Sequence, residues 1–131
     1  MTLESTQENV PLAGVAVRAI SESQGFDPQS ANMVQLALEE ALTNVIRHAY
    51  QGRPGLNIEL TVSAKPDRIT LEIRHQGLGL ASWPSKTTHP PDGLREGGRG
   101  IFLINNIMDQ VSYSTREGAS LLTMTKRRDL K

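Results

Sequence analysis

Residues 36–50 read LALEEALTNVIRHAY, and this stretch decides how the rest of the chain is interpreted. Its hydrophobic residues recur at the spacing of an amphipathic helix. Glu40, Asn44 and His48 follow at intervals of four residues, and each interval turns the chain by about 40° around the helix axis. Their side chains therefore form a slanting row beside the hydrophobic stripe. A carboxylate and a carboxamide in that row are either solvated surface groups or the polar edge of a site.

The helix that contains this stretch has sequence signals at both ends. Asp27 and Pro28 form an N-cap residue followed by proline at the first helical position, and the segment 51–55, QGRPG, ends the helix. We therefore expect one continuous helix of about 22 residues, longer than the mean of about 11–12. The expected buried stripe comprises Val34, Leu38, Ala41, Leu42, Val45 and Ala49.

The residues before this helix predict a shorter helix beside it. We expect Asn9 to cap that helix, Pro11 to lie in its first turn and Gly25 to end it. Residues 1–6 are too few for a firm assignment and are compatible with an edge strand.

The residues after the long helix predict a hairpin and then a loop. Residues 56–63 and 69–73 alternate hydrophobic and polar side chains around a turn at 65–68, as an antiparallel hairpin does. His75 continues the hydrophobic phase of the second strand, so we expect it to point toward the helices. Residues 81–96 have no period and predict a long loop, which in a small domain is usually a lid or a binding segment.

The last third of the chain predicts a helix and a closing hairpin. The helix follows a glycine cluster at 97–100 and runs to Met108, and the hairpin strands cover 111–115 and 120–126. We expect the basic tail 126–128 to be solvated. The element order predicts an α/β (α+β) two-layer sandwich, with three helices on one face of a mostly antiparallel sheet.

The composition excludes several classes of protein. The 131 residues, 37% of them hydrophobic and 21% charged, predict a single globular domain over residues 1–131. The 14 Lys and Arg residues balance the 14 Asp and Glu residues, so no net field favours nucleic acid or a membrane as a direct partner. With no cysteine, no signal-peptide pattern and no run of about 20 hydrophobic residues, we expect a cytoplasmic protein without disulfides.

Three features of the sequence can together build a nucleotide site. Glu40 and Asn44 lie on one helix edge, Gly77 and Gly79 follow a strand, and the cluster 97–100 opens a helix. Glycines at a helix N-terminus expose backbone N–H groups to an anion, and a carboxamide oxygen is a suitable ligand for Mg²⁺. A carboxylate one turn away can take a proton from a hydroxyl nucleophile.

The chain resembles bacterial anti-sigma-factor serine/threonine kinases, which belong to the ATPase superfamily of histidine kinases, gyrase, Hsp90 and MutL. The resemblance extends from about Val10 to Lys126. It implies a Bergerat-type ATP-binding fold with ATP and Mg²⁺ as cofactors. The motifs that carry it, in order, are Glu40-x-x-x-Asn44, His48-Ala49-Tyr50, Gly77-x-Gly79, Gly98-Arg99-Gly100-Ile101-Phe102-Leu103-Ile104 and Met108-Asp109-Gln110-Val111.

The resemblance also implies a role for each matching residue. Glu40 would be the general base and Asn44 the Mg²⁺ ligand, and Gly77 and Gly79 would let the backbone approach adenine. The residues implied at the phosphates are Gly97, Gly98, Arg99 and Gly100. The plainer interpretations are a solvated carboxylate at Glu40, a structural residue at His48, a packed core histidine at His75, a solvated Arg99 and a tight turn for the glycines.

Members of this family phosphorylate a serine or threonine of a small antagonist protein, bind a sigma factor in a partner switch, and typically act as dimers. The resemblance implies the same partners and a homodimer here. One position departs from the family pattern, because the aspartate that accepts a hydrogen bond from the adenine amino group is His75 in this chain. A neutral imidazole has an acceptor nitrogen and can substitute, whereas a protonated one cannot.

Two further interpretations stay open beside the kinase. The first is a nucleotide-impaired module that keeps the fold and acts by binding its partners alone. The second is a detached catalytic domain of a histidine kinase.

Overall fold

The computed structural model describes the backbone of residues 1–76 and 96–128, and the side chains of residues 1–76 and 102–128. In chain order the elements are β1 (Thr2–Glu4), α1 (Asn9–Ser23), α2 (Pro28–Asn44), the π-helical turn η1 (Val45–Ala49), β2 (Asn57–Lys65), β3 (Arg68–His75), α3 (Glu96–Ile107), β4 (Gln110–Arg116) and β5 (Ala119–Arg127). The predicted helices and strands are all present in the predicted order. The predicted loop lies outside the described residues, except for Glu96 at the start of α3.

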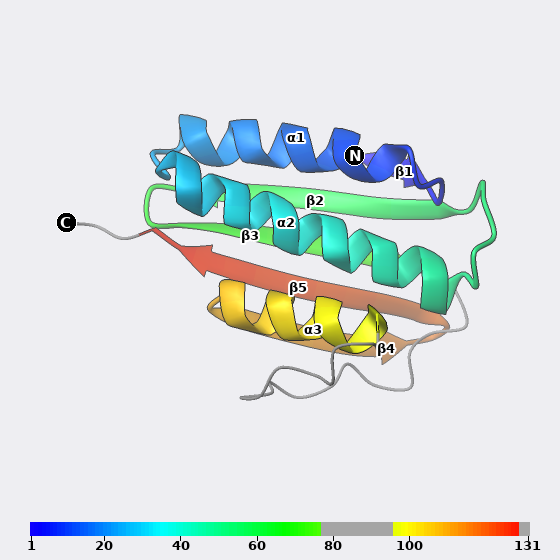
Figure 1. The fold of residues 1–131 in the computed structure, drawn as a ribbon. Coiled ribbons are helices and arrows are strands. Elements are labelled where there is room, and N and C mark those ends of the chain that lie inside the picture. Colours follow the sequence, from blue (N-terminus) through cyan, green and yellow to red (C-terminus); the bar gives the residue numbers. More distant parts are fainter. Residues whose placement is uncertain (77–95, 129–131) are drawn as a thin grey trace.

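The elements form two layers, with the helices on one face of a five-stranded sheet (Figure 1). The strand order is β1-β2-β3-β5-β4, and every pair of neighbouring strands in the described residues is antiparallel. The predicted two-layer α+β architecture is therefore confirmed, as is the tentative edge strand at the N-terminus.

The core lies between the helices and the sheet. The predicted stripe of the long helix is buried along its whole length, from Val34 to Ala49. Opposite it, the inward residues of β3 are buried too, at Ile69, Leu71 and Ile73. Burying these side chains supplies the main driving force for folding, at about 25 cal/mol per Å² of apolar surface. The outward residues of β2 are polar and exposed, so the second face of the sheet is open to water.

The helix starts agree with the sequence signals at α2 but not at α1. The Asp27 carboxylate caps α2 by accepting a hydrogen bond from the Ser30 backbone N–H at 2.7 Å, and this bond lowers the pKa of Asp27. The predicted cap at Asn9 is wrong, because Glu8 occupies the N-cap position of α1 without a side-chain cap bond. Asn9 is the first helical residue, and its Nδ2 donates to the Glu4 carbonyl instead.

The basic tail is also corrected by the structure. It was expected to be solvated, yet Lys126 and Arg128 are half-buried. Lys126 Nζ donates to the Ile107 carbonyl at 2.9 Å, at the end of α3, and Arg128 Nη1 donates to the Gln24 carbonyl at 3.0 Å, at the end of α1. The last carbonyls of a helix lack intrahelical partners and carry negative charge, so basic side chains stabilise them.

The long helix runs from Pro28 to Ala49, as predicted, but it is not uniformly α-helical. Residues Val45–Ala49 form one π-helical turn, after which Gln51 has a φ of 53° and Gly52 a φ of 77°. A π turn accommodates one extra residue and often lies at a functional site. None of the helices within residues 1–76 and 96–128 combines the length and hydropathy that crossing a membrane requires.

Candidate functional site

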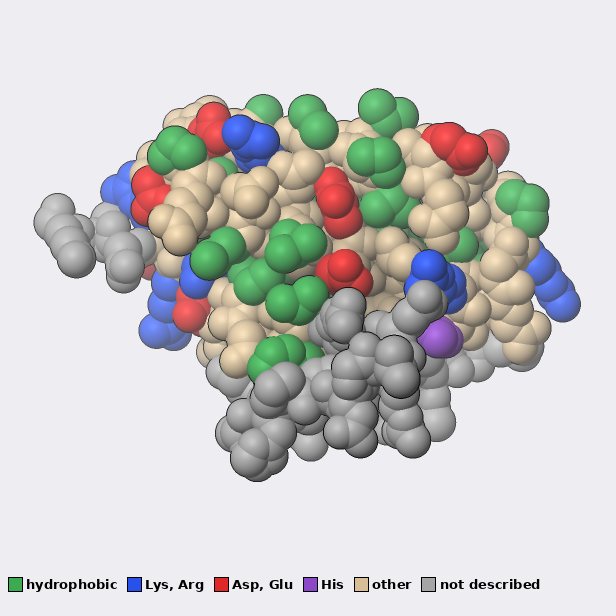
Figure 2. All heavy atoms as spheres, viewed as in Figure 1, with side chains coloured by type: hydrophobic (Ala, Val, Ile, Leu, Met, Phe, Trp, Pro, Cys, Tyr) green, Lys and Arg blue, Asp and Glu red, His purple; other side chains and the backbone are tan. Residues whose placement is uncertain are grey.

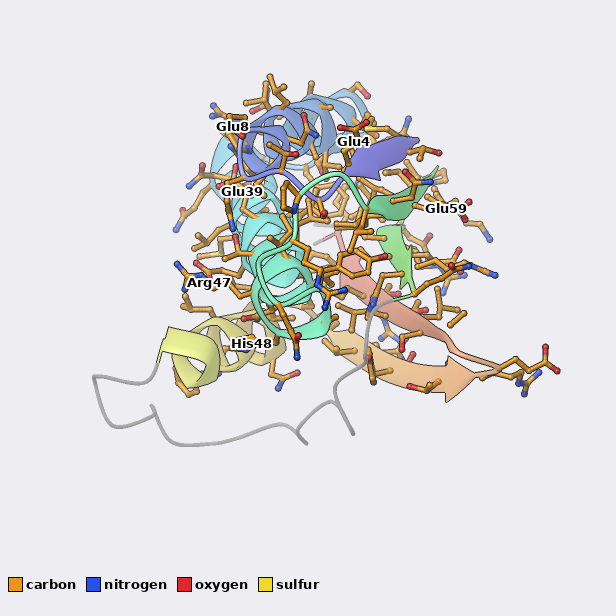
Figure 3. The ribbon with its side chains drawn as sticks, turned by 90° about the vertical axis from the view of Figure 1, so that its right-hand side faces the viewer. Glu4, Glu8, Glu39, Arg47, His48 and Glu59 are labelled. Atoms are coloured by element: carbon orange, nitrogen blue, oxygen red, sulfur yellow. The ribbon has the colours of Figure 1, made fainter. Side chains whose placement is uncertain are left out.

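The long helix and β3 finish at the same end of the sandwich (Figure 1), so Asn44 and His75 lie near that end. Figure 3 views the molecule from there. Arg47 and His48 project from the end of the helix there, whereas Glu59 lies on β2 at the sheet side. His48 is exposed. This orientation is consistent with the prediction that His48 is a structural residue at the end of the helix.

The structure distinguishes the two adjacent carboxylates of the long helix. Glu39 accepts a hydrogen bond from Gln35 Nε2 at 2.9 Å and packs over Gly14 of α1, where a Cβ atom would overlap its carboxylate. Glu40 is half-buried, and its carboxylate has no hydrogen bond or ion pair in the described part of the chain. Glu39 is therefore bonded within α2 and packed against α1, whereas Glu40 has no polar partner in the described part of the chain.

Asn44 lies one helical turn beyond Glu40 and is only 4% exposed. Its Nδ2 group has no hydrogen-bond partner among the described residues. An unpaired amide inside a protein destabilises the fold by about 1–3 kcal/mol, so such groups generally have a reason to be there. A ligand that accepts hydrogen bonds would supply the missing partner.

The π turn places Tyr50 between the ends of two strands. The Tyr50 hydroxyl donates to the Asn57 carbonyl at 2.5 Å and accepts from the Gln76 backbone N–H at 3.0 Å. The tyrosine ring is buried and forms a T-shaped pair with the His75 ring, with ring centroids 6.0 Å apart. Tyr50 thus fixes the chain immediately before the predicted glycine motif at 77–79.

His75 points toward the helices, as its strand phase predicted, and is 1% exposed. Neither ring nitrogen has a hydrogen-bond partner in residues 1–76 or 102–128. Burial lowers the pKa of His75, because the charged imidazolium loses its hydration there. The imidazole is therefore neutral near pH 7 and keeps one acceptor nitrogen.

A hollow of about 610 Å³ adjoins this end of the sheet. It lies between the segment 49–57 and the ends of β2 and β3, and Tyr50 and His75 contribute to its wall. Glu59 and Arg74, which are cross-strand partners with exposed side chains, bring opposite charges to its rim.

Several predicted site residues fall where the description is partial or absent. Gly77 and Gly79 lie outside the described residues. Gly97, Gly98, Arg99 and Gly100 form the first turns of α3, and only their backbone is described. Their place at a helix start fits an anion-binding role, since the first N–H groups of a helix have no intrahelical partner.

The sequence did not single out Tyr50, Tyr113 or Ser120 as individual site residues. Ser120 is buried and is the cross-strand partner of His75, while Tyr113 stacks on the His75 ring. The one sequence signal was that Tyr50 belongs to the His48-Ala49-Tyr50 motif. The other two could be found only from the register of β3, β5 and β4, which depends on contacts between distant segments.

The residues present fit a nucleotide and its metal ion. Within the described residues, a buried carboxamide with an unpaired N–H group lies one helical turn from a carboxylate without a polar partner, and both are on the helix that packs against α3. Carboxamide oxygens are ligands of Mg²⁺, which usually takes only one or two ligands from the protein.

Comparison with known proteins gives a consistent result. A model of the histidine kinase-like ATPase domain matches residues 3–126. The serine-protein kinase RsbW of Halalkalibacterium halodurans is 31% identical over 135 residues, which cover 96% of this chain and 80% of that protein. RsbW of Listeria monocytogenes is 30% identical over 137 residues, covering 96% and 84%, and RsbW of Oceanobacillus iheyensis is 27% identical over 129 residues, covering 93% and 82%.

Proposed function

The chain belongs to the histidine kinase-like ATPase family, among its anti-sigma serine-protein kinases, and on that premise we propose that it phosphorylates a serine or threonine of a small antagonist protein with ATP. The observation that carries the proposal is the pair Glu40 and Asn44 on one helix edge. The first has a carboxylate without partners among the described residues and the second a buried amide with an unpaired N–H group.

The reaction assigns a distinct task to each residue. The acceptor hydroxyl oxygen forms a bond to the γ-phosphorus, the bond from that phosphorus to the bridging oxygen breaks, and ADP leaves. Glu40 takes the hydroxyl proton, for which its half-buried, unpaired carboxylate is suited. Asn44 would hold Mg²⁺, which when bound neutralises charge on the phosphates. The backbone N–H groups of residues 97–100 would hold the phosphates, with Arg99 beside them. Gly77, Gly79 and His75 would lie next to the adenine ring.

The proposal extends to the partners and the assembly. We propose that residues 1–131 form one kinase domain, which works in the cytoplasm, binds a sigma factor and forms a homodimer. Hydrophobic side chains gather on the outer surface over α1 and α2 (Figure 2), and Leu12 and Val15 of α1 are 67% and 59% exposed. Apolar surface of this kind suits association with a protein. Light scattering coupled to size-exclusion chromatography tests the dimer, with twice the monomer mass as the expected result.

The decisive experiment is a calorimetric titration of the full chain with Mg-ATP and Mg-ADP, followed by phosphotransfer to the cognate antagonist protein. We expect saturable heat with a Kd below about 1 mM and a phosphorylated serine or threonine in the antagonist. Absence of both heat and thermal shift at millimolar nucleotide would reject the kinase. That result would instead support a module that acts by binding its partners alone, the alternative that histidine at position 75 left open.

A further inference from the structure

Among the described residues near the end of β3, His75 is the most enclosed polar side chain. Its side chain is 1% exposed, and both Nδ1 and Nε2 lack a hydrogen-bond partner in the part of the chain that the structure describes. Two unpaired ring nitrogens in one buried side chain are unusual, because each forgoes a hydrogen bond that water would supply in the unfolded chain.

The orientation of the His75 ring is restricted by two tyrosines. Tyr113 stacks on it at 6.2 Å between ring centroids with an interplanar angle of 29°, and Tyr50 meets it edge-on at 6.0 Å and 82°. Tyr50 is itself held by hydrogen bonds to Asn57 and Gln76. Because the ring is packed on two sides, the freedom that it retains is the position of its proton, on Nδ1 or on Nε2.

The neighbouring hydroxyl groups have the same chemical flexibility. Ser120 is directly opposite His75 in the β3–β5 ladder, and directly opposite residues project to the same face of a sheet. Ser120 Oγ lies 3.3 Å from Thr115 Oγ1, and either atom can be the donor. A hydroxyl can donate or accept, and so can a neutral imidazole through its two tautomers. Because neither hydroxyl is hydrogen-bonded to the imidazole, they do not fix which ring nitrogen of His75 carries the proton.

We propose that His75 is a specificity-determining residue and that the site binds adenine and guanine nucleotides with similar affinity. The proposal rests on the proposed nucleotide-binding function. At position 6 adenine presents an amino donor and guanine a carbonyl acceptor. A carboxylate can only accept, so it would favour adenine and repel guanine. The imidazole meets either base by moving its proton between the two nitrogens.

The test compares Mg-ATP and Mg-GTP by calorimetry with the full chain and its variants. For the unmodified protein we expect the two dissociation constants to agree within about tenfold, since one hydrogen bond can form with each base. His75→Asp should raise the preference for ATP to more than about a hundredfold, because the carboxylate leaves the guanine oxygen without a donor. His48→Asp introduces the same charge at an exposed histidine and should leave the ratio unchanged.

Two additions keep the test decisive. If His75→Asp does not fold, His75→Asn replaces it, because a carboxamide both donates and accepts and should preserve binding of both nucleotides within tenfold of each other. In ¹⁵N spectra of histidine-labelled protein, the His75 signals should report opposite tautomers in the ATP and GTP complexes.

The outcomes separate the two proposals. Binding of ATP with GTP more than about a hundredfold weaker, or the same His75 tautomer in both complexes, would overturn the shared specificity and leave the nucleotide site intact. Failure to bind either nucleotide would overturn both the specificity and the proposed kinase.

Discussion

The two ends of the sandwich differ in how far their buried polar groups are paired. At the end where α1 finishes and α2 begins, Asp27 caps α2, and Arg128 donates to the Gln24 carbonyl through Nη1 and to the Asp67 carbonyl through its backbone N–H. Only its Nε is buried there without a hydrogen-bond partner among the described residues. At the other end Asn44 and His75 are buried with nitrogens that have no partner in residues 1–76 or 102–128, and the helix finishes in a π turn. We call these the capped end and the site end.

The difference distinguishes polar groups that stabilise the fold of the free protein from polar groups that a ligand could pair. A satisfied helix end stabilises the folded state in the free protein. A buried unpaired amide or imidazole destabilises it until a ligand supplies the bond. Substitutions at the capped end should therefore change stability, whereas substitutions at the site end should change nucleotide chemistry and its dependence on pH.

The largest expected effect is on catalysis at the site end. Glu40→Gln should lower the rate of phosphotransfer by about 10²–10⁴-fold with little change in Mg-ATP affinity, because the amide cannot take the hydroxyl proton. Single-turnover transfer of labelled phosphate measures the rate, and calorimetry measures the affinity. Glu39→Gln is the matched control, since its side chain can still accept the bond from Gln35 and should keep the rate within a few-fold. Equal rates in the two variants would remove Glu40 from the role of base.

At the capped end, the largest effect on stability is expected for Gly25→Ala. Gly25 has a φ of 101°, and an added Cβ would overlap the Arg128 guanidinium. We expect the free energy of unfolding to fall by about 2–3 kcal/mol, from backbone strain and from displacement of that side chain. Gly118→Ala is the control, because its φ is 78° and a Cβ there meets open space, so strain alone should cost about 1 kcal/mol. Urea denaturation measures both variants. Equal losses of unfolding free energy in Gly25→Ala and Gly118→Ala would mean that displacing the Arg128 side chain costs no stability.

The site end should show its own dependence of stability on pH. Burial lowers the pKa of His75 below the ordinary value of 6.5, so between these two values the unfolded chain binds more protons than the folded one. The His75 contribution to stability is therefore complete above about pH 6.5 and is lost as the pH falls toward the folded pKa, with a slope of at most about 1.4 kcal/mol per pH unit. Urea denaturation across this range measures it, and His75→Asn should remove that part of the slope. An unchanged slope in the variant would contradict the assignment.

The smallest expected effect concerns the link between the tail and α3. Lys126→Met keeps the hydrophobic stem but loses the bond to the Ile107 carbonyl, so stability should fall by about 1 kcal/mol. Arg127→Met is the control, because the Arg127 side chain is exposed and its backbone N–H still bonds Asp109, and it should stay within about 0.5 kcal/mol. Thermal denaturation measures the stability of both variants. Equal losses in the two would contradict the assignment of Lys126 as a cap of α3.

Much of the fold could be predicted from local patterns. The alternation of Ile69, Leu71 and Ile73 correctly predicted that His75 faces the helices, and Asp27-Pro28 correctly predicted the start of the long helix. The prediction of a solvated tail is correct for Arg127 but wrong for Lys126 and Arg128, because the helix ends that these two side chains bond cannot be known from a run of basic residues. The assignment of Glu40, Asn44 and the glycines to a nucleotide site remains a prediction.

The sequence by itself determined the elements, their faces and the family, because helical and strand periods and short motifs are local properties of the chain. Only the tertiary structure decided that Glu39 is held against α1 while Glu40 is free of protein partners in the described residues, and that Tyr50, Tyr113 and Ser120 surround His75. Those relations depend on strand register and helix packing, which bring together residues far apart in the chain. A one-residue shift in register would turn each side chain of a strand to the opposite face, so no local pattern can specify its neighbours.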